Sequence, residues 1–559
     1  MKIRRILSLF MISLLFSLSL TSCSRKEDKV SLKFEKTKFV NYSQDYEMPS
    51  EYINTYFVDD SEIRYVDATN FFKALKGFYM TSYFRVSSTY FSKNLSIFCY
   101  VNTGEKIFKT SVTFDWTNDK ITVSDRYFFN LINMSVQTDY SRLISEKGAT
   151  TTNEDALVFN LSDFGFNMYY KNGKCLVPFS IMNTIFCSND YYNIYYDGEK
   201  YFGVTYDISS YTKENQIQLK TCSLNNKAQT QELREETYNH LKFVLNYYYG
   251  LKDFKNINSI ELELEPYKEG ILSLDPEVNK QTYYSYFVNH LDELHTRMGA
   301  YSFYYDPTVI ATQDNWDLEK TSPARKKYKE VEEELKSLST GIYNDENTYR
   351  VSGSTLVIYL KSFVTGTTEQ INSTDAYKYD TYEFVKYALD NVSGQGIENV
   401  VLDLSQNGGG NVGALFRVLG FISDDSIEYC SHDYLFNSTS SSLIDIDIDN
   451  DGNFEDLDAY SEYKWHVLSS YNTFSAANSF VAMSKSLGAT IIGQKSGGGM
   501  CSVLPIILPD QTTIEISSQN AQMAVVDGEY DLIEGGIEPD ILIDYDKFYD
   551  IDYINSILV

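Results

Sequence analysis

Short apolar runs and amphipathic segments alternate along the second half of the chain. The apolar runs, typical of buried strands, span 355–360, 399–404, 465–468, 490–492 and the region around 541. Helical periodicity appears at 280–294, 322–339, 381–392, 476–487 and from 412 onward. Strands that alternate with helices are typical of a layered α/β domain, so we predict this fold class for the second half.

The first half is rich in tyrosine and has a different pattern. Polar–apolar alternation at 110–116 and 120–124 predicts strands. Two other segments, 62–72 and 173–182, each lead from a short strand pattern into a short helical one. We therefore predict a strand-rich α+β N-terminal module, joined to the second half by a charged helix at 227–248.

The start of the chain has the pattern of an export signal. Three basic residues precede an apolar run at 6–20, which is too short for a membrane span. The run ends in Leu-Thr-Ser-Cys23, which resembles the lipobox of bacterial lipoproteins, in which the cysteine is acylated. The resemblance implies a lipid anchor at Cys23, on the extracytoplasmic side of a bacterial membrane in the cell envelope. The alternative is an ordinary cleaved signal with a chance cysteine.

Charge excludes one class of partner. Removal of residues 1–22 leaves 45 basic against 77 acidic side chains, a net charge of −32. Such a surface repels phosphate backbones, so we expect no nucleic-acid partner. Six cysteines remain after Cys23, and none forms a C-x-x-C pair; a Cys175–Cys187 disulfide and isolated buried thiols are both open.

Ser475 stands where the apolar run 465–468 gives way to the helical pattern 476–487. Free backbone N–H groups and the positive end of the helix dipole gather at such a helix N-terminus. The same environment stabilises the oxyanion of acyl transfer. The simpler alternative is that Ser475 only caps the helix.

Three glycine- and histidine-containing motifs accompany Ser475. They are the sequence Asp-Glu-Leu-His-Thr at 292–296, the loop Asn407-Gly-Gly-Gly410, and a second glycine run at 497–499. The loop lacks the G-K-[ST] sequence of a Walker phosphate loop. With Gly-Ile-Glu-Pro-Asp at 536–540, these motifs resemble, in order and spacing, the tail-specific (C-terminal-processing) serine peptidase family, in its tricorn-like and retinoid-binding-protein-like branch. The resemblance covers roughly residues 240–545.

The resemblance implies a crotonase-like ββα catalytic domain and a serine mechanism. Ser475 falls at the nucleophile position and His295 at the position of the histidine that acts as general base. The backbone N–H groups of Gly409, with Gly408 as the alternative, and of Ala476 are expected to bind the oxyanion. This chemistry needs no cofactor.

The chain also departs from the family pattern. Bacterial processing members use a lysine base, but Gly499 stands at that position, with Lys495 only nearby. The tricorn-like branch often has a small hydroxyl residue before its histidine, whereas here Leu294 precedes it. That branch also has a distant supporting glutamate, for which Glu534 is the nearest candidate.

These observations predict a membrane-anchored, exported serine endopeptidase that acts on polypeptides. The expected domains are a signal peptide at 1–22, the N-terminal module at 23–235 and the catalytic domain at 236–559. Strand–helix units of the N-terminal module resemble the N-terminal domain of copper amine oxidases and carry no metal site. The departures motivate the alternative of a catalytically inactive surface lipoprotein that binds peptides or apolar ligands.

A second site is expected just before the Ser475 strand. The segment 447–458 has the D-x-D-x-D-G spacing of a calcium loop, with Gly452 at the sharp turn. The candidate ligands are Asp447, Asp449, Asp451, Asn453 and Asp458. We expect a structural calcium ion there; the alternative is a solvated acidic loop in an acidic protein.

Overall fold

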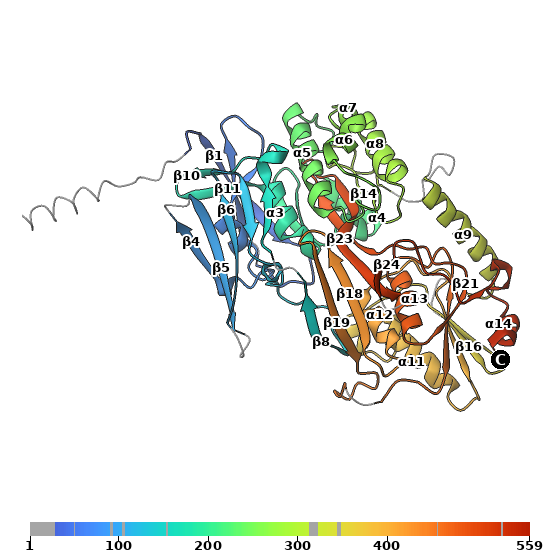
Figure 1. Cartoon of the computed structure of the whole chain (residues 1–559). Coiled ribbons are helices and arrows are strands. Elements are labelled where there is room, and N and C mark those ends of the chain that lie inside the picture. The colour runs from blue at the N-terminus through green and yellow to red at the C-terminus, as the bar shows by residue number, and fades with distance from the viewer. Residues whose placement is uncertain are drawn as a thin grey trace, which may run out of the picture.

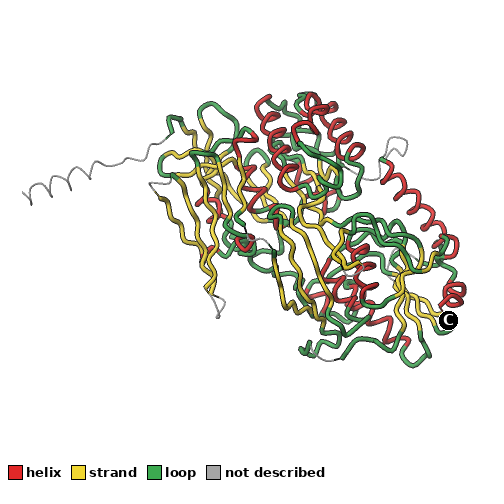
Figure 2. Tube along the Cα trace, in the orientation of Figure 1, coloured by secondary structure: helices red, strands yellow, loops and turns green. Residues whose placement is uncertain are grey.

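The computed structural model describes residues 28–49, 51–89, 93–102, 107–152, 155–311, 322–343, 348–454, 457–526 and 529–558. The expected signal peptide and Cys23 lie outside these residues. Figures 1 and 2 show a strand-rich N-terminal region beside a mixed α/β region. The predicted α/β fold class with a strand-rich N-terminal part is confirmed.

Two antiparallel-rich sheets make up most of the N-terminal region. The first has the order β10 (Tyr169–Lys171), β11 (Lys174–Pro178), β3 (Tyr65–Asp67), β2 (Glu51–Val58), β1 (Leu32–Asn41), β13 (Lys200–Thr205), β12 (Tyr192–Tyr196). The second has the order β4 (Phe84–Thr89), β5 (Asn94–Asn102), β6 (Ile107–Asp115), β7 (Lys120–Val123), β9 (Leu157–Asn160). Both predicted strand–helix units are confirmed, since β3 leads into α2 (Ala68–Ala74) and β11 into α3 (Phe179–Phe186).

A group of helices follows the N-terminal sheets in the chain, and most of it lies at the top of the view in Figure 1. They are α4 (Lys213–Lys220), α5 (Gln231–Tyr248), α6 (Ile260–Leu264), α7 (Lys268–Ile271) and α8 (Pro276–Tyr284). The hydroxyl of Thr230 caps α5 by accepting a hydrogen bond from the N–H of Leu233 at 3.2 Å. The helix predicted at 280–294 ends earlier, because α8 continues only as a π-helical segment, Ser285–His290.

A six-stranded sheet positions the candidate site. Its order is β15 (Thr348–Ser352), β16 (Thr355–Tyr359), β17 (Asn399–Asp403), β20 (Lys464–Ser469), β21 (Thr490–Gly493), β25 (Ile541–Leu542). All neighbours after β16 pair in parallel, as the predicted alternation of strands and helices requires. The carboxyl ends of β17 and β20 therefore meet at one edge of the sheet.

Helices cover both faces of this sheet. Along β17, Val400 and Leu402 pack into a core with α11 (Thr381–Val392), α12 (Val412–Leu419) and α13 (Ala476–Ser486). Val401, which points to the other face, packs with α9 (Pro323–Ser339) and α14 (Ile551–Leu558) (Figure 1). Burial on both faces explains why these strands are continuous apolar runs in the sequence.

The sequence analysis did not predict the remaining large sheet. Its order is β14 (Arg297–Ala300), β23 (Thr513–Val526), β18 (Ile427–Asp433), β19 (Ser438–Ile446), β8 (Ile144–Thr151), and β22 (Cys501–Ile507) and β24 (Glu529–Leu532) also pair with β23. Strand β8 comes from the first half of the chain, yet it pairs with β19. The sheet therefore ties the two halves together, and the division into domains at residue 235 stays a prediction.

Two smaller expectations concern thiols and membranes. All six cysteines of the described residues are free, so Cys175 and Cys187 are isolated buried thiols and not a disulfide. Burial raises the pKa of both thiols well above its ordinary value. Within the described ranges, no helix has the length and apolarity that a bilayer span needs.

Phe480 tests the core behind the candidate site. It is fully buried in α13, and its ring stacks on Phe363 with the centroids 5.3 Å apart. We expect Phe480→Ala to lower the free energy of unfolding by about 3–5 kcal/mol in urea titrations, since it leaves a cavity. Phe254 is 55% exposed, so Phe254→Ala should change it by less than about 0.5 kcal/mol. Equal effects of the two changes would contradict this packing.

Candidate functional site

Ser475 lies on a strained turn between β20 and α13. Its backbone has φ 58° and ψ −127°, a conformation that residues with a side chain rarely adopt. The hydroxyl does not cap α13, so the simple N-cap interpretation does not describe this side chain. A serine on a strained strand-to-helix turn, with its hydroxyl free of the helix, has the geometry of an exposed nucleophile.

Hydrogen bonds hold this turn against the loop that follows β17. The hydroxyl of Thr473 donates to the carbonyl of Leu404 at 2.7 Å, and the N–H of Phe474 donates to the carbonyl of Asn407 at 3.2 Å. The N–H of Ser475 itself donates to the carbonyl of Gly498 at 2.8 Å. Both glycine runs predicted from the sequence therefore lie beside Ser475.

Gly409 makes the closest approach of backbone to the nucleophile. Its φ is +109°, and a methyl group added there would lie 2.9 Å from Cβ of Ser475 and 3.0 Å from N of Ala476. Only glycine fits such a position, because the added carbon clashes and the backbone conformation is strained for other residues.

The amides near Ser475 differ in their hydrogen bonds. The N–H of Gly409, the first expected oxyanion donor, donates instead to the side-chain carbonyl of Asn407 at 2.9 Å. Within the described part of the chain, the N–H groups of Gly408 and Ala476 make no hydrogen bond. The alternative donor, Gly408, is therefore the glycine whose amide is open in this conformation.

His295 lies on the turn between the π-helical segment and β14. The side chain is 7% exposed, and its ring centroid lies 4.6 Å from that of Phe474, the residue before Ser475. None of the hydrogen bonds among the described residues joins the imidazole to the Ser475 hydroxyl; such contacts are often long without substrate. The structure thus brings His295 next to the Ser475 turn from a segment 180 residues earlier in the chain.

The imidazole of His295 is held neutral. Its pKa is lowered to about 4, mainly by burial; Glu293 opposes this shift, and the charges of Arg297 and Arg325 add to it. Glu293 accepts a hydrogen bond from the backbone N–H of His295 at 2.6 Å. A neutral imidazole can accept a proton at pH 7, which a general base requires.

Glu534 lies near this group but does not touch His295. Its carboxylate accepts a hydrogen bond from the N–H of Met500 at 2.8 Å. Burial, supported by repulsion from Glu293, raises its pKa to about 7. Glu534 therefore belongs to the same buried region as His295, although no hydrogen bond of the described residues joins the two side chains. Glu293, to which the sequence pattern gave no role, has a charge that raises the pKa of both side chains.

The remaining lysine and histidine candidates lie elsewhere. Lys495 forms an ion pair with Glu538 at 2.9 Å, and its side chain is 49% exposed, so it does not serve Ser475 as a base in this conformation. The other four histidines also have separate partners: His240 contacts Thr184, His290 contacts Glu263, His432 contacts Thr439, and His466 contacts Asn399.

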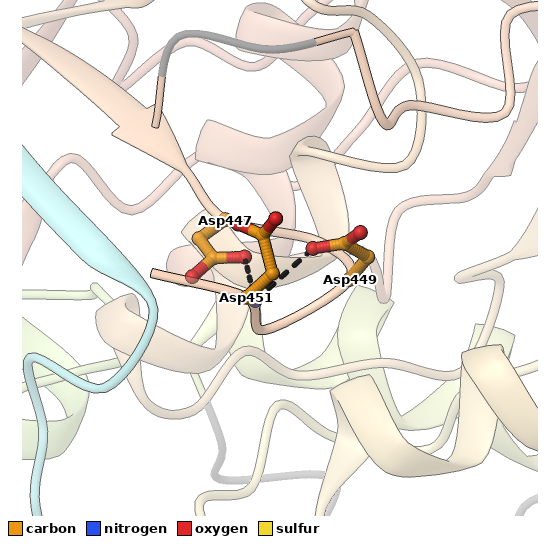
Figure 3. Close-up of side chains that lie close together, drawn as sticks. All are labelled: Asp447, Asp449 and Asp451. Atoms are coloured by element: carbon orange, nitrogen blue, oxygen red, sulfur yellow. Dashed lines mark hydrogen bonds between the residues drawn. The ribbon is translucent and has the colours of Figure 1, made fainter. Parts of the chain in front are cut away.

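In the acidic loop before β20, backbone N–H groups donate hydrogen bonds to carboxylates of the same loop. Carboxylate oxygens of Asp447, Asp449 and Asp451 lie within 4.8 Å of one another (Figure 3). Asp447 accepts hydrogen bonds from the N–H groups of Asn450, Asp451 and Gly452.

Two other candidate ligands of this loop lie outside that group of three. Asp458 accepts hydrogen bonds from the N–H groups of Ile448 and Asp449, and therefore closes the loop through the backbone. The N–H of Asn453 donates to Asp451 at 2.8 Å. The predicted spacing therefore gathers three carboxylates, and all five candidates lie in one loop.

Residues 355–543 match the sequence model of peptidase family S41. The match spans the strands from β16 to β25, including the Ser475 turn and the first glycine loop. The family resemblance predicted from the motifs is confirmed over these residues, and the His295 motif lies before the matched region. No curated protein matches the sequence.

Several solved structures are similar in fold. A putative peptidase from Parabacteroides merdae has 16% identity and a TM-score of 0.40, covering 60% of this chain and 98% of its own. A lipoprotein from Streptococcus agalactiae has 13% identity and a TM-score of 0.36, covering 57% of this chain and 96% of its own. The tricorn protease has 9% identity and a TM-score of 0.31, covering 95% and 62%.

The fit of Gly409 against Ser475 predicts a specific sensitivity. We expect Gly409→Ala to lower the free energy of unfolding by about 1–3 kcal/mol, since strain at a special φ adds to steric overlap. Gly394→Ala is the control, because Gly394 also has a positive φ (+76°) but has nothing within 4 Å of the added carbon. Gly394→Ala should lower the free energy of unfolding by less than Gly409→Ala does, as measured by thermal or urea unfolding. Equal losses would show that Gly409 is not in contact with the Ser475 turn.

Proposed function

We propose that this chain is a serine endopeptidase in which Ser475 is the nucleophile and His295 the general base. The observation that carries the proposal is the strained turn that presents Ser475 beside Gly409, with the neutral imidazole of His295 packed against the same turn. The match to an S41 peptidase domain supports hydrolysis of peptide bonds and a polypeptide substrate. No cofactor enters this chemistry.

In the proposed mechanism, His295 removes the hydroxyl proton as Ser475 Oγ attacks the scissile carbonyl carbon. The negative charge that develops on the carbonyl oxygen is bound by the open N–H groups of Gly408 and Ala476, at the positive end of α13. The imidazolium then gives its proton to the leaving amine. Water, activated by the same imidazole, hydrolyses the acyl-enzyme and restores Ser475.

Carboxylates support the imidazolium in this proposal. Glu293 is hydrogen-bonded to the backbone of His295, and its charge helps to raise the pKa of Glu534. Negative charge beside the imidazolium stabilises it while the acyl-enzyme forms. We assign Glu534 the role of distant support and not of a direct hydrogen-bond partner.

Cleavage of casein and of a peptide library by the purified full chain tests the assignment. We expect Ser475→Ala to abolish cleavage, because it removes the nucleophile, and His295→Ala to lower kcat by about 10³-fold or more, because it removes the base. A fluorophosphonate probe should label the wild-type chain but not Ser475→Ala. His466→Ala is the control, since that histidine contacts Asn399 inside the sheet, and it should keep the cleavage pattern. Full cleavage by His295→Ala would reject His295 as the base.

The second candidate function is a catalytically inactive protein that binds peptides or apolar ligands. Leu294 before the histidine, and the lack of a hydrogen bond between His295 and Ser475 among the described residues, favour it. A chain that binds library peptides but is not labelled by the fluorophosphonate would support this alternative.

The proposal includes the cellular setting predicted from the sequence. Acylation of Cys23 would hold the enzyme on the extracytoplasmic side of a bacterial membrane, with the strand-rich N-terminal module between the anchor and the S41 domain. The likeness to a lipoprotein of Streptococcus agalactiae concerns the fold alone.

We also propose that the loop 447–458 binds a structural calcium ion. The clustered oxygens of Asp447, Asp449 and Asp451 support it, since calcium prefers such carboxylate ligands (Figure 3). The ion would neutralise repulsion in the loop and stiffen the segment that leads into β20. Position nine of the loop, Glu455, lies outside the described residues.

Titration with calcium chloride in a calorimeter tests this site. We expect one ion to bind and to raise the melting temperature, because binding to the folded state alone stabilises it. Asp449→Asn and Asp451→Asn should weaken binding by about tenfold or more, since each removes a charged ligand. Asp425→Asn, outside the loop, is the matched control. Wild-type chain that gives neither heat nor a thermal shift would reject the site.

A further inference from the structure

A buried arginine brackets the turn that carries His295. Arg325, near the start of α9, is 1% exposed. One terminal nitrogen of its guanidinium donates to the carbonyl of Glu293 at 2.9 Å, and the other donates to the carbonyl of Thr296. These carbonyls lie on either side of His295, two residues before it and one residue after it.

The same helix is attached to both halves of the site. The carboxylate of Asp292 accepts a hydrogen bond from the N–H of Ala324 at 3.0 Å, which joins the first turn of α9 to the His295 turn. Further along α9, the ring of Tyr328 packs edge-on against Phe474, next to Ser475. Because one helix makes both contacts, it fixes the distance between the His295 turn and the Ser475 turn.

Strand β23 holds the His295 turn from the other side. The hydroxyl of Ser517 donates to Glu293 at 3.2 Å, and its N–H donates to the hydroxyl of Thr296 at 3.1 Å. The turn therefore lies between two anchors, Ser517 on β23 and Arg325 on α9. A guanidinium suits the second anchor because its planar fork presents two separate nitrogens to the two carbonyls, whereas an ammonium donates from a single nitrogen.

We propose that Arg325 is a positioning residue, whose guanidinium fixes the His295 turn for proton transfer. The inference rests on the proposed function. It assigns a role to a residue outside the motifs that carried the sequence analysis, on a helix that precedes the matched S41 region.

Charged groups face His295 from each neighbouring element. Its own turn provides Glu293, β14 provides Arg297 and α9 provides Arg325. The charge of Arg297 is balanced by Glu515 of β23, which lies 2.9 Å away. The charge of Glu293 also raises the pKa of Glu534. Loss of the Arg325 charge should therefore shift the balance toward the imidazolium, and the acid limb of activity should move to higher pH.

Two substitutions separate geometry from charge. Arg325→Lys keeps the charge but cannot hold both carbonyls, so we expect kcat to fall by about tenfold or more with KM little changed and the acid limb unmoved. Arg325→Met removes the charge and the hydrogen bonds to both carbonyls, so kcat should fall further and the acid limb of kcat/KM should move to higher pH. Arg234→Lys is the matched control, since Arg234 is also fully buried and pairs with Asp510 at 3.1 Å, away from the His295 turn.

The outcomes distinguish this inference from the proposed function. Either of two results would overturn the positioning role. The first is a wild-type kcat in Arg325→Lys. The second is a loss of kcat in Arg325→Lys no larger than that in Arg234→Lys, together with an unmoved acid limb in Arg325→Met. If Arg325→Met does not fold, the kcat of Arg325→Lys still decides. Failure of the proposed function would appear differently, as a wild-type chain that neither cleaves peptides nor reacts with the fluorophosphonate.

Discussion

The parallel pairing of β17 with β20 is the constraint on which the candidate site depends. Its last pair joins Asp403 to Leu468, so both strands end at the same edge of the sheet. The glycine loop and the Ser475 turn then begin side by side and bond to each other through Thr473 and Phe474. Gly409 fits against Ser475 only because the two loops start in this register. A slip of one residue would turn every core side chain of the strand to the opposite face, so the apolar layers on both sides also fix the site.

The second requirement is a neutral base in a charged region. Charged groups surround the His295 turn, yet burial is the largest cause of the low pKa of the imidazole. A buried imidazole costs folding energy only when it is protonated, so the folded state favours the form that accepts a proton. Because the turn is buried, its polar groups need hydrogen-bond partners, and Arg325 and Ser517 provide them.

The sequence predicted the parts of this arrangement that follow from local pattern. The strands at 355–360, 399–404 and 465–468 and the helix at 381–392 are present because continuous apolar runs and helical periodicity are strong signals. Ser475 and His295 came from motifs, and their proximity could not be read from periodicity because they arrive from different sheets. The sheet built on β23 was missed, since its pairing with β8 and β18 is long-range. Arg325 lies in the helix predicted at 322–339, but its partners are backbone carbonyls, which leave no mark in a sequence.

The carboxylates set a further limit on how the site can work. Glu534 is buried near Glu293, and its pKa of about 7 means that the pair gains a negative charge as the pH rises through neutrality. In the proposed mechanism the imidazolium exists only between attack and departure of the amine, and it is stabilised by that charge. Below pH 7 the proton on Glu534 removes this support, although His295 is still able to accept a proton. Two ionisations therefore act on the proposed mechanism at different pH. The ring of His295 must be neutral before attack, which sets the acid limit of activity, and the charge on Glu534 stabilises the imidazolium further as the pH rises through neutrality.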